Sequence, residues 1–264
     1  MLFLLAFVAL YLLAVWTPIG QSAENALVVG FADQARIFEW SQSVGPPPLT
    51  AEHATVAVGL ALIVLVALVR RCWREGCAAV GVVVVTIAGA EVLNKVVLPR
   101  PDLVGAPDNL TEASFPSGHV AIAAGLALGA VLIASPRTRP YVAAAGSLWL
   151  AVTAAAVQAL YWHRPSDALG ATLLACAAYA LATQLLPPTV RDAVPSATPD
   201  VASRRRTLPA VALLPAAVGA LLAGSREDAL ARPLVFAGAA FLCAVLIRIL
   251  ATQRSGRPVP RPQR

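Results

Sequence analysis

The chain has 264 residues, of which 58% are hydrophobic and 13% are charged, and its mean hydropathy is +0.73. Soluble domains carry about twice this proportion of charged residues, so the composition excludes an ordinary soluble protein and predicts an integral membrane protein. The net charge of +6 is attributed to basic loops that fix membrane topology, rather than to nucleic-acid binding.

The apolar residues fall into eight segments, each about as long as a membrane-spanning helix. A backbone in lipid must satisfy its own hydrogen bonds, so each segment is predicted to be an α-helix. The first segment has some features of a signal peptide with cleavage near Ser22-Ala23. It lacks a basic amino-terminal region, which favours an uncleaved span. The predicted spans are 2–16, 54–70, 78–97, 118–134, 141–162, 167–186, 208–223 and 233–250.

These segments predict an all-α polytopic membrane protein. Residues 1–186 are expected to form a six-span core, with 17–52 as its outer loop. A cytoplasmic linker rich in Pro, Ser and Arg follows at 187–207. Residues 208–250 are expected to form a transmembrane hairpin, and 251–264 a basic cytoplasmic tail.

The positions of Lys and Arg predict the orientation of the chain. With a cytoplasmic amino terminus, 14 of the 20 basic residues lie on the inner side and six on the outer side, as the positive-inside rule favours. The outer six are Arg36, Lys95, Arg100, Arg164, Arg226 and Arg232.

Three polar clusters then meet at the outer face, at 91–102, 116–119 and 161–167. They contain Lys95, which is the only lysine, and two of the three histidines. Ionisable groups beside spanning helices are costly and usually mark function. Tyr161 and Trp162 are interpreted as aromatic residues of the membrane interface rather than of a site.

The cluster Pro116-Ser117-Gly118-His119 opens the fourth span. We expect Pro116 in the first helical turn, where a proline loses no hydrogen bond. Ser117 and Gly118 then leave free N–H groups at a helix amino terminus, which binds anions and phosphate in particular. His119 is placed to donate a proton. Alone, the tetrapeptide fits an ordinary helix cap equally well.

His163 and Asp167 are four residues apart, so the carboxylate can hold one ring nitrogen and leave the other as a nucleophile. With the cations Lys95 and Arg100, these groups indicate metal-independent phosphoryl transfer through a phosphohistidine. The simpler alternatives are a structural His–Asp pair and a lysine that extends to the interface with Glu91 as its ion partner. All these polar groups are predicted to lie at the outer membrane face, which favours a phosphate site over the simpler alternatives.

The residues resemble the type 2 phosphatidic acid phosphatases (PAP2), a family of membrane lipid phosphate phosphatases, over roughly residues 54–186. The resemblance rests on Lys95…Arg100-Pro101, on Pro116-Ser117-Gly118-His119 and on His163…Asp167. It implies that His163 attacks phosphorus, that Asp167 supports His163 and that His119 protonates the leaving alkoxide. It also implies a phosphate held by Lys95, Arg100, Ser117 and Gly118.

The chain departs from the family pattern in two places. Four residues separate Lys95 from Arg100, where the family has six. The third motif of the family has Ser-Arg upstream of its histidine, and these positions are Ala156 and Val157 here. One phosphate-binding cation is therefore missing, and Arg164 is a candidate replacement.

The expected function is hydrolysis of a lipid phosphomonoester or pyrophosphate at the extracytoplasmic side of a bacterial cell membrane. The substrate classes implied are phosphatidate, phosphatidylglycerol phosphate and polyprenyl (pyro)phosphate. No metal or cofactor is expected, and the four cysteines form neither a zinc motif nor a disulfide framework. The expected partners are the substrate and membrane lipids, without nucleic acid. The alternative is a weak or inactive relative that binds or transports phospholipid.

Overall fold

A computed structural model describes residues 1–28, 46–186 and 231–253, and every regular element in these ranges is a helix. The predictions for 187–207 and 208–223 therefore lie outside the described residues, as does the tail after 253. The longer helices are α1 (Leu2–Val15), α2 (Pro18–Val28), α5 (Glu52–Val69), α6 (Trp73–Val92), α8 (Gly118–Ile133), α9 (Arg139–Ala159), α10 (Pro165–Leu185) and α12 (Ala231–Gln253). Short helical turns are α4 (Pro47–Thr50), η2 (Leu93–Val97) and α7 (Asp108–Thr111).

The described helices confirm an all-α polytopic membrane protein. Five are long and apolar enough to cross a bilayer, namely α5, α6 with its continuation η2, α9, α10 and α12. The sixth candidate is the pair α1 and α2, which is bent by 78°. Helix α5 shows why these helices suit lipid: Val58, Leu62 and Leu65 are more than half exposed, which water would penalise and lipid does not.

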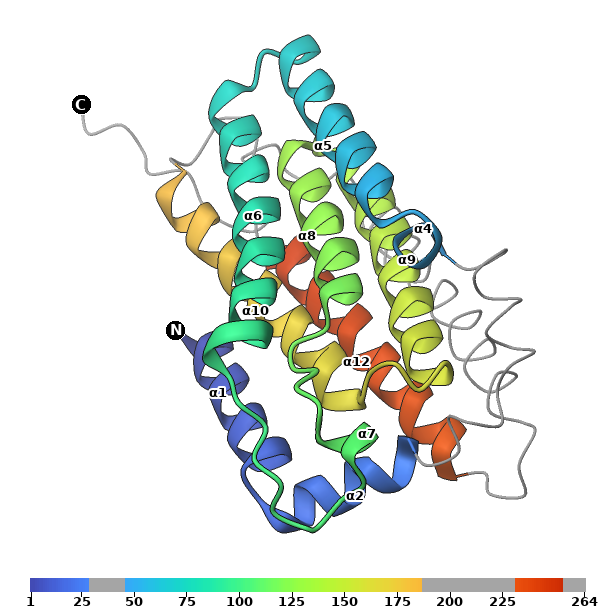
Figure 1. The fold of residues 1–264 in the computed structure, drawn as a ribbon. Coiled ribbons are helices and arrows are strands. Elements are labelled where there is room, and N and C mark those ends of the chain that lie inside the picture. The colour runs from blue at the N-terminus through green and yellow to red at the C-terminus, as the bar shows by residue number, and fades with distance from the viewer. Residues whose placement is uncertain (29–45, 187–230, 254–264) are drawn as a thin grey trace.

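Helix α8 lies at the centre of the bundle, between α6, α9 and α10 (Figure 1). It has 16 residues and is therefore about 24 Å long, shorter than a typical span. Thirteen of its residues are buried, as expected for a helix that is apolar on all sides. Small residues allow close contact with its neighbours; a Cβ on Gly146 of α9 would lie 2.8 Å from the Cβ of Ala127.

One end of the bundle collects the predicted polar clusters, and we call it the site end. Helices α8 and α10 begin there, whereas α6 and α9 end there. Helix α12 also begins there, because the rings of Phe236 and Tyr161 lie 6.3 Å apart. This is the direction that the sequence predicts for the last span.

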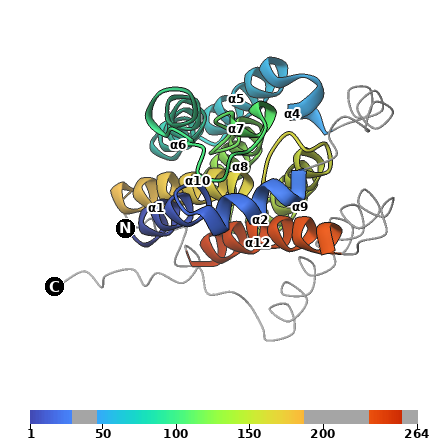
Figure 2. The same ribbon diagram turned by 60° about the horizontal axis from the view of Figure 1, so that its bottom comes forward.

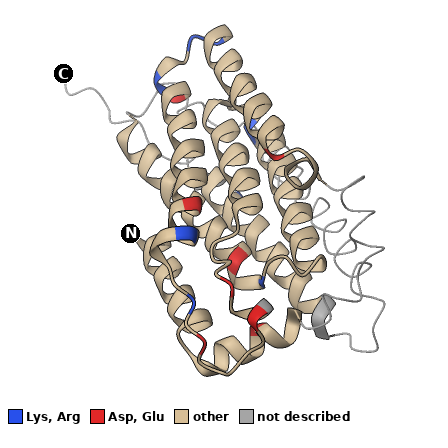
Figure 3. Ribbon diagram, in the orientation of Figure 1, with Lys and Arg blue, Asp and Glu red and all other residues tan. Residues whose placement is uncertain are grey.

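The opposite end carries most of the described arginines that the sequence places on the inner side, whereas acidic residues gather mainly toward the site end (Figure 3). Arg70 donates a hydrogen bond to the carbonyl of Ile133 there, which ties α5 to the end of α8. The arginines of the α5–α6 and α8–α9 loops are Arg70, Arg71, Arg74, Arg137 and Arg139.

The segment 17–52, which the sequence predicted as an outer loop, contains a helix among its described residues. Helix α2 begins at Pro18 and lies across the site end, from the side of α1 toward that of α12 (Figures 1 and 2). Three polar side chains at helical spacing, Gln21, Glu24 and Asn25, are at most 9% exposed. Their burial is sustained by hydrogen bonds to the loops and helix ends beneath them.

Candidate active site

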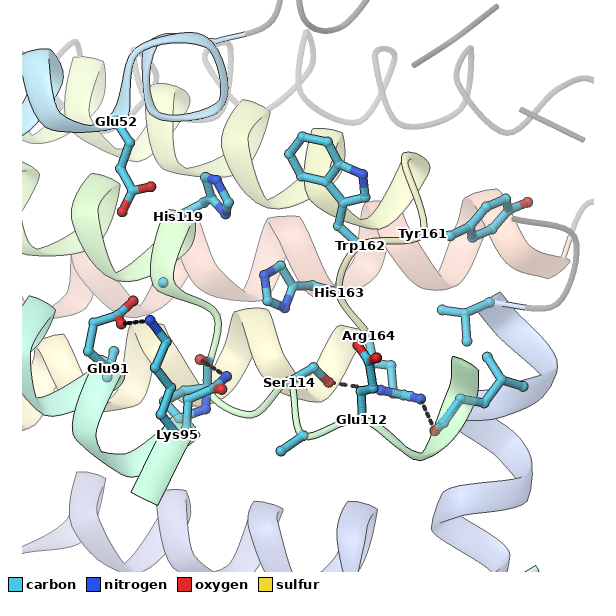
Figure 4. Close-up of a pocket in the computed structure, with 17 residues that line it drawn as sticks. Glu52, Glu91, Lys95, Glu112, Ser114, His119, Tyr161, Trp162, His163 and Arg164 are labelled. Atoms are coloured by element: carbon cyan, nitrogen blue, oxygen red, sulfur yellow. Dashed lines mark hydrogen bonds and ion pairs between the residues drawn. The ribbon is translucent and has the colours of Figure 1, made fainter. Parts of the chain in front are cut away.

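A cavity of about 310 Å³ opens at the site end, between the ends of α6 and α9 and the starts of α8 and α10. Figure 4 shows the rings of His119, Trp162 and His163 toward its middle, with the Glu91–Lys95 pair on one side and Arg164 on the other. The charged and polar residues that line the cavity are Glu52, Glu91, Asn94, Lys95, Glu112, Ser114, His119, Tyr161, Trp162, His163 and Arg164.

The first helical residue of α8 is Gly118, and Ser117 is its N-cap. Pro116 therefore precedes the helix instead of occupying its first turn, because the Ser117 side chain accepts from the N–H of Val120 and starts the helix one residue later. The N–H of Ser117 donates to the Asp167 carbonyl at 3.0 Å, so this group is not free for phosphate. The first N–H groups within the helix, those of Gly118 and His119, have no intrahelical acceptor.

A tight turn after α9 places His163 at the cavity. Tyr161 has a φ of 54°, the left-handed conformation that commonly ends a helix. The N–H groups of Trp162 and His163 then donate to the Val157 carbonyl at 3.0 and 3.2 Å. The side chain of Val157, at the position of the missing family arginine, is fully buried.

Asp167 is fully buried in the first turn of α10, and its Oδ2 atom has two partners. It accepts from the N–H of Arg164 at 2.9 Å, and it lies 3.3 Å from Nδ1 of His163. A carboxylate acceptor fixes the proton of the neutral imidazole on Nδ1, which leaves Nε2 with its lone pair. The predicted His–Asp pair is therefore present, and Asp167 also caps the helix.

The two histidines face one another from different elements. The ring centroids of His119 and His163 are 6.1 Å apart, close enough for both imidazoles to contact one tetrahedral group bound beside them. The ring of Trp162 lies 5.6 Å from that of His119 and lines the cavity. Trp162 and Tyr161 therefore belong to the cavity wall, whereas the sequence placed them at the membrane interface. The turn after α9 places Trp162 against His119, whereas the ring of Tyr161 points away toward Phe236 of α12 (Figure 4).

Lys95 lines the cavity and pairs with Glu91, with 2.5 Å between Nζ and Oε2. Both side chains are substantially exposed, so the pair itself contributes little to stability. The other carboxylate oxygen of Glu91 would lie 3.3 Å from a Cβ placed on Gly118. Glu91 therefore sits beside the amino terminus of α8, where an anion would bind.

Arg164 lines the cavity and is 5% exposed. Its Nη1 donates to Ser114 Oγ at 2.8 Å, and its Nη2 donates to the Leu110 carbonyl at 2.7 Å and to Asn25 Oδ1 at 3.2 Å. These bonds hold the guanidinium in one place at the cavity wall. Its position is consistent with the candidate role as a replacement cation.

Arg100 is not among the residues that line the cavity. Its Nη2 donates to Asn25 Oδ1 at 3.2 Å, the oxygen that Arg164 also uses, and its Nη1 is buried without a hydrogen-bond partner. Burial first, and then the nearby Arg164, lower the pKa of Arg100. The sequence placed Arg100 directly on the phosphate. The structure places it beside Arg164 instead, because both side chains donate to Asn25 of α2.

Glu24 and Asn25 are site-end residues that the sequence analysis missed. They lie in a segment interpreted as a loop. The signal that identifies them is the spacing of Gln21, Glu24 and Asn25, which is typical of one helix face. Ser114 and Glu112 were also missed, since nothing in their local sequence indicates a cavity. Among the described residues, no three of His, Cys, Asp and Glu gather as a metal site.

Comparison with known proteins gives one match. Residues 82–191 match the family model described as the PAP2 superfamily. No curated protein and no solved structure matches the chain. The matched segment contains Lys95, His119, His163 and Asp167, while α1, α2 and α5 lie outside it. Residues 82–191 of this polytopic membrane protein are thus a PAP2 superfamily domain, which indicates a phosphatase-type activity.

Proposed function

We propose that the protein is a metal-independent lipid phosphate phosphatase that works through a phosphohistidine. The observation that carries the proposal is the facing pair His119 and His163, whose rings are 6.1 Å apart, with Asp167 behind His163. A nucleophile, its orienting carboxylate and a proton donor are thereby arranged around one space. The family match supports the phosphatase class, and the site geometry supports the mechanism.

In the first step, Nε2 of His163 attacks phosphorus, and the new P–N bond replaces the P–O bond to the lipid. Asp167 accepts the hydrogen bond from Nδ1 of His163, so the proton stays on Nδ1. The carboxylate also stabilises the positive charge that the ring gains. His119 gives its proton to the departing alkoxide or phosphate oxygen. In the second step, water attacks phosphorus, His119 takes a proton from that water, and the P–N bond breaks to release phosphate.

The phosphate oxygens are expected at the amino terminus of α8, where the N–H groups of Gly118 and His119 and the helix dipole favour an anion. Lys95 and Arg164 contribute positive charge from the two sides of the cavity. The volume of about 310 Å³ suits a phosphate or pyrophosphate headgroup rather than a whole lipid. The tail would then remain among the exposed apolar side chains of the bundle.

The proposed membrane face is extracytoplasmic, in a bacterial cell membrane. Support comes from the arginines at the end opposite the cavity, which the positive-inside rule assigns to the cytoplasm. Substrates of this class are phosphatidate, phosphatidylglycerol phosphate and polyprenyl phosphate or pyrophosphate. A labelling reagent that does not cross membranes should modify Cys residues introduced near Glu112 in intact cells, and should leave those near Arg71 unmodified.

The decisive experiment measures phosphate release from these lipids by the purified protein in EDTA. The wild type is expected to be active, and His163→Ala to lose at least three orders of magnitude in kcat, as expected for removal of a covalent nucleophile. His53→Ala is a matched control, because His53 is exposed and does not line the cavity.

Two results would contradict the proposal. Activity that disappears in EDTA and returns with a divalent cation would refute the metal-independent mechanism. A wild type that binds lipid phosphates without releasing phosphate from any of them would favour the binding or transport alternative. The observation that favours this alternative is Val157, which stands where the family has a phosphate-binding arginine.

A further inference from the structure

The buried face of α2 connects the site-end loops, although α2 lies outside the matched domain. This α2 polar face consists of Gln21, Glu24 and Asn25. Gln21 donates to the carbonyls of Val15 and Pro101 and accepts from the N–H of Leu103, at 2.6 to 3.1 Å. These bonds fix α2 against the segment that follows Arg100.

Asn25 has the most unusual environment on this face. Its single Oδ1 atom accepts hydrogen bonds from Arg100 and Arg164, both at 3.2 Å, and the side chain is 7% exposed. Two guanidinium groups that share one neutral acceptor repel each other, and burial strengthens this repulsion. Without the acceptor, the two side chains would lower their energy by separating.

Glu24, one residue before Asn25, holds the start of α10. Its two carboxylate oxygens accept from the N–H of Ser166 at 3.0 Å and from the Ser166 hydroxyl at 2.8 Å. Ser166 precedes Asp167, which contacts the proposed nucleophile His163. The α2 polar face is therefore attached both to the arginine pair and to the helix turn that carries the orienting carboxylate.

We propose that Asn25 is a positioning residue that holds Arg100 and Arg164 together. The pair then supplies the positive charge of the arginine that the family has at the position of Val157. Arg164 stands at the cavity wall and Arg100 reinforces its charge from behind the Asn25 amide. The proposal rests on the proposed phosphatase function, because it assigns the pair to the binding of a phosphate group.

The test measures orthovanadate binding by calorimetry, together with kcat and KM for the best lipid phosphate. Orthovanadate is used because it binds a phosphate site whether or not the lipid substrate has been identified. Asn25→Leu removes the shared acceptor at similar volume. Asn25→Asp keeps an acceptor oxygen but cancels one positive charge. Gln158→Leu is the matched control, because Gln158 is a fully buried amide that donates only within α9.

Asn25→Leu is expected to raise the Kd of orthovanadate and the KM on the order of tenfold, the equivalent of one hydrogen bond to a charged group, with a smaller change in kcat. Asn25→Asp should weaken orthovanadate binding to a similar extent while melting close to the wild-type temperature. Gln158→Leu should leave the orthovanadate Kd unchanged.

The inference is overturned if folded Asn25→Asp binds orthovanadate as the wild type does, or if Gln158→Leu weakens binding as much as the Asn25 variants do. Should Asn25→Leu fail to fold, the Asp variant decides. A wild type that binds orthovanadate but hydrolyses no lipid phosphate refutes the proposed function alone. A wild type that does not bind orthovanadate refutes the inference as well.

Discussion

The substitution Asp167→Asn tests the proposed nucleophile most directly, because it removes a charge and almost no volume. Asp167 accepts from the N–H of Arg164 and faces Nδ1 of His163 through one oxygen, while its second oxygen is buried without a hydrogen-bond partner. An asparagine can place its side-chain carbonyl oxygen where Oδ2 of Asp167 makes these two contacts. The fold should therefore survive, and the loss should fall on the chemistry.

The size of this loss follows from the contact distance. A unit negative charge 3.3 Å from a ring that becomes positive is worth about 5 kcal/mol at an effective dielectric constant of 20. This value is an upper bound, since the ring of His163 is partly exposed. It corresponds to at most about 10⁴ in rate, and we expect kcat to fall by about 10³. The weaker N-cap should cost only about 1 kcal/mol of stability.

The assay is phosphate release under saturating lipid phosphate, with thermal melting of the same preparation. Asp102→Asn is the matched control. Asp102 is exposed and accepts from the N–H groups of Val104 and Ala106, which lower its pKa. It should retain full activity. If Asp167→Asn retains wild-type kcat, or loses kcat only in proportion to unfolded protein, Asp167 does not support the nucleophile and the reasoning from the His163 contact is wrong.

Two further predictions concern the cavity and the packing behind it. Glu91→Gln should lower the inhibition constant of inorganic phosphate about three- to tenfold. The substitution removes a carboxylate beside the amino terminus of α8 and releases Lys95 from its ion pair. Weaker inhibition would instead show that Glu91 directs Lys95 toward the anion. Gly170→Ala should lower the free energy of unfolding by about 1–3 kcal/mol, because the added Cβ would lie 2.5 Å from the ring of Phe115. Thermal or denaturant melting measures this change. Unchanged stability would show that the Phe115 ring moves freely.

The sequence by itself determined the membrane class and the helical spans within the described residues. Long apolar runs specify helices in lipid because the backbone has no other way to satisfy its hydrogen bonds. The predicted boundaries agree with α5, α8, α9, α10 and α12 to within a few residues. The predicted span 78–97 begins five residues after the start of α6 and ends where η2 ends. Local spacing also predicted the His163–Asp167 contact, since residues four apart meet at the start of a helix.

Only the tertiary structure decided which distant residues share the cavity and how the cations are held. The inward direction of Trp162 depends on the turn after α9, and the position of Arg100 depends on its bond to Asn25. Helix α2 was missed because its buried polar face resembles the polarity of a loop until its partners are known. Side chains such as Glu24 and Asn25 gain their roles from hydrogen bonds to residues 75 to 142 positions away, and local sequence patterns carry no information on such contacts.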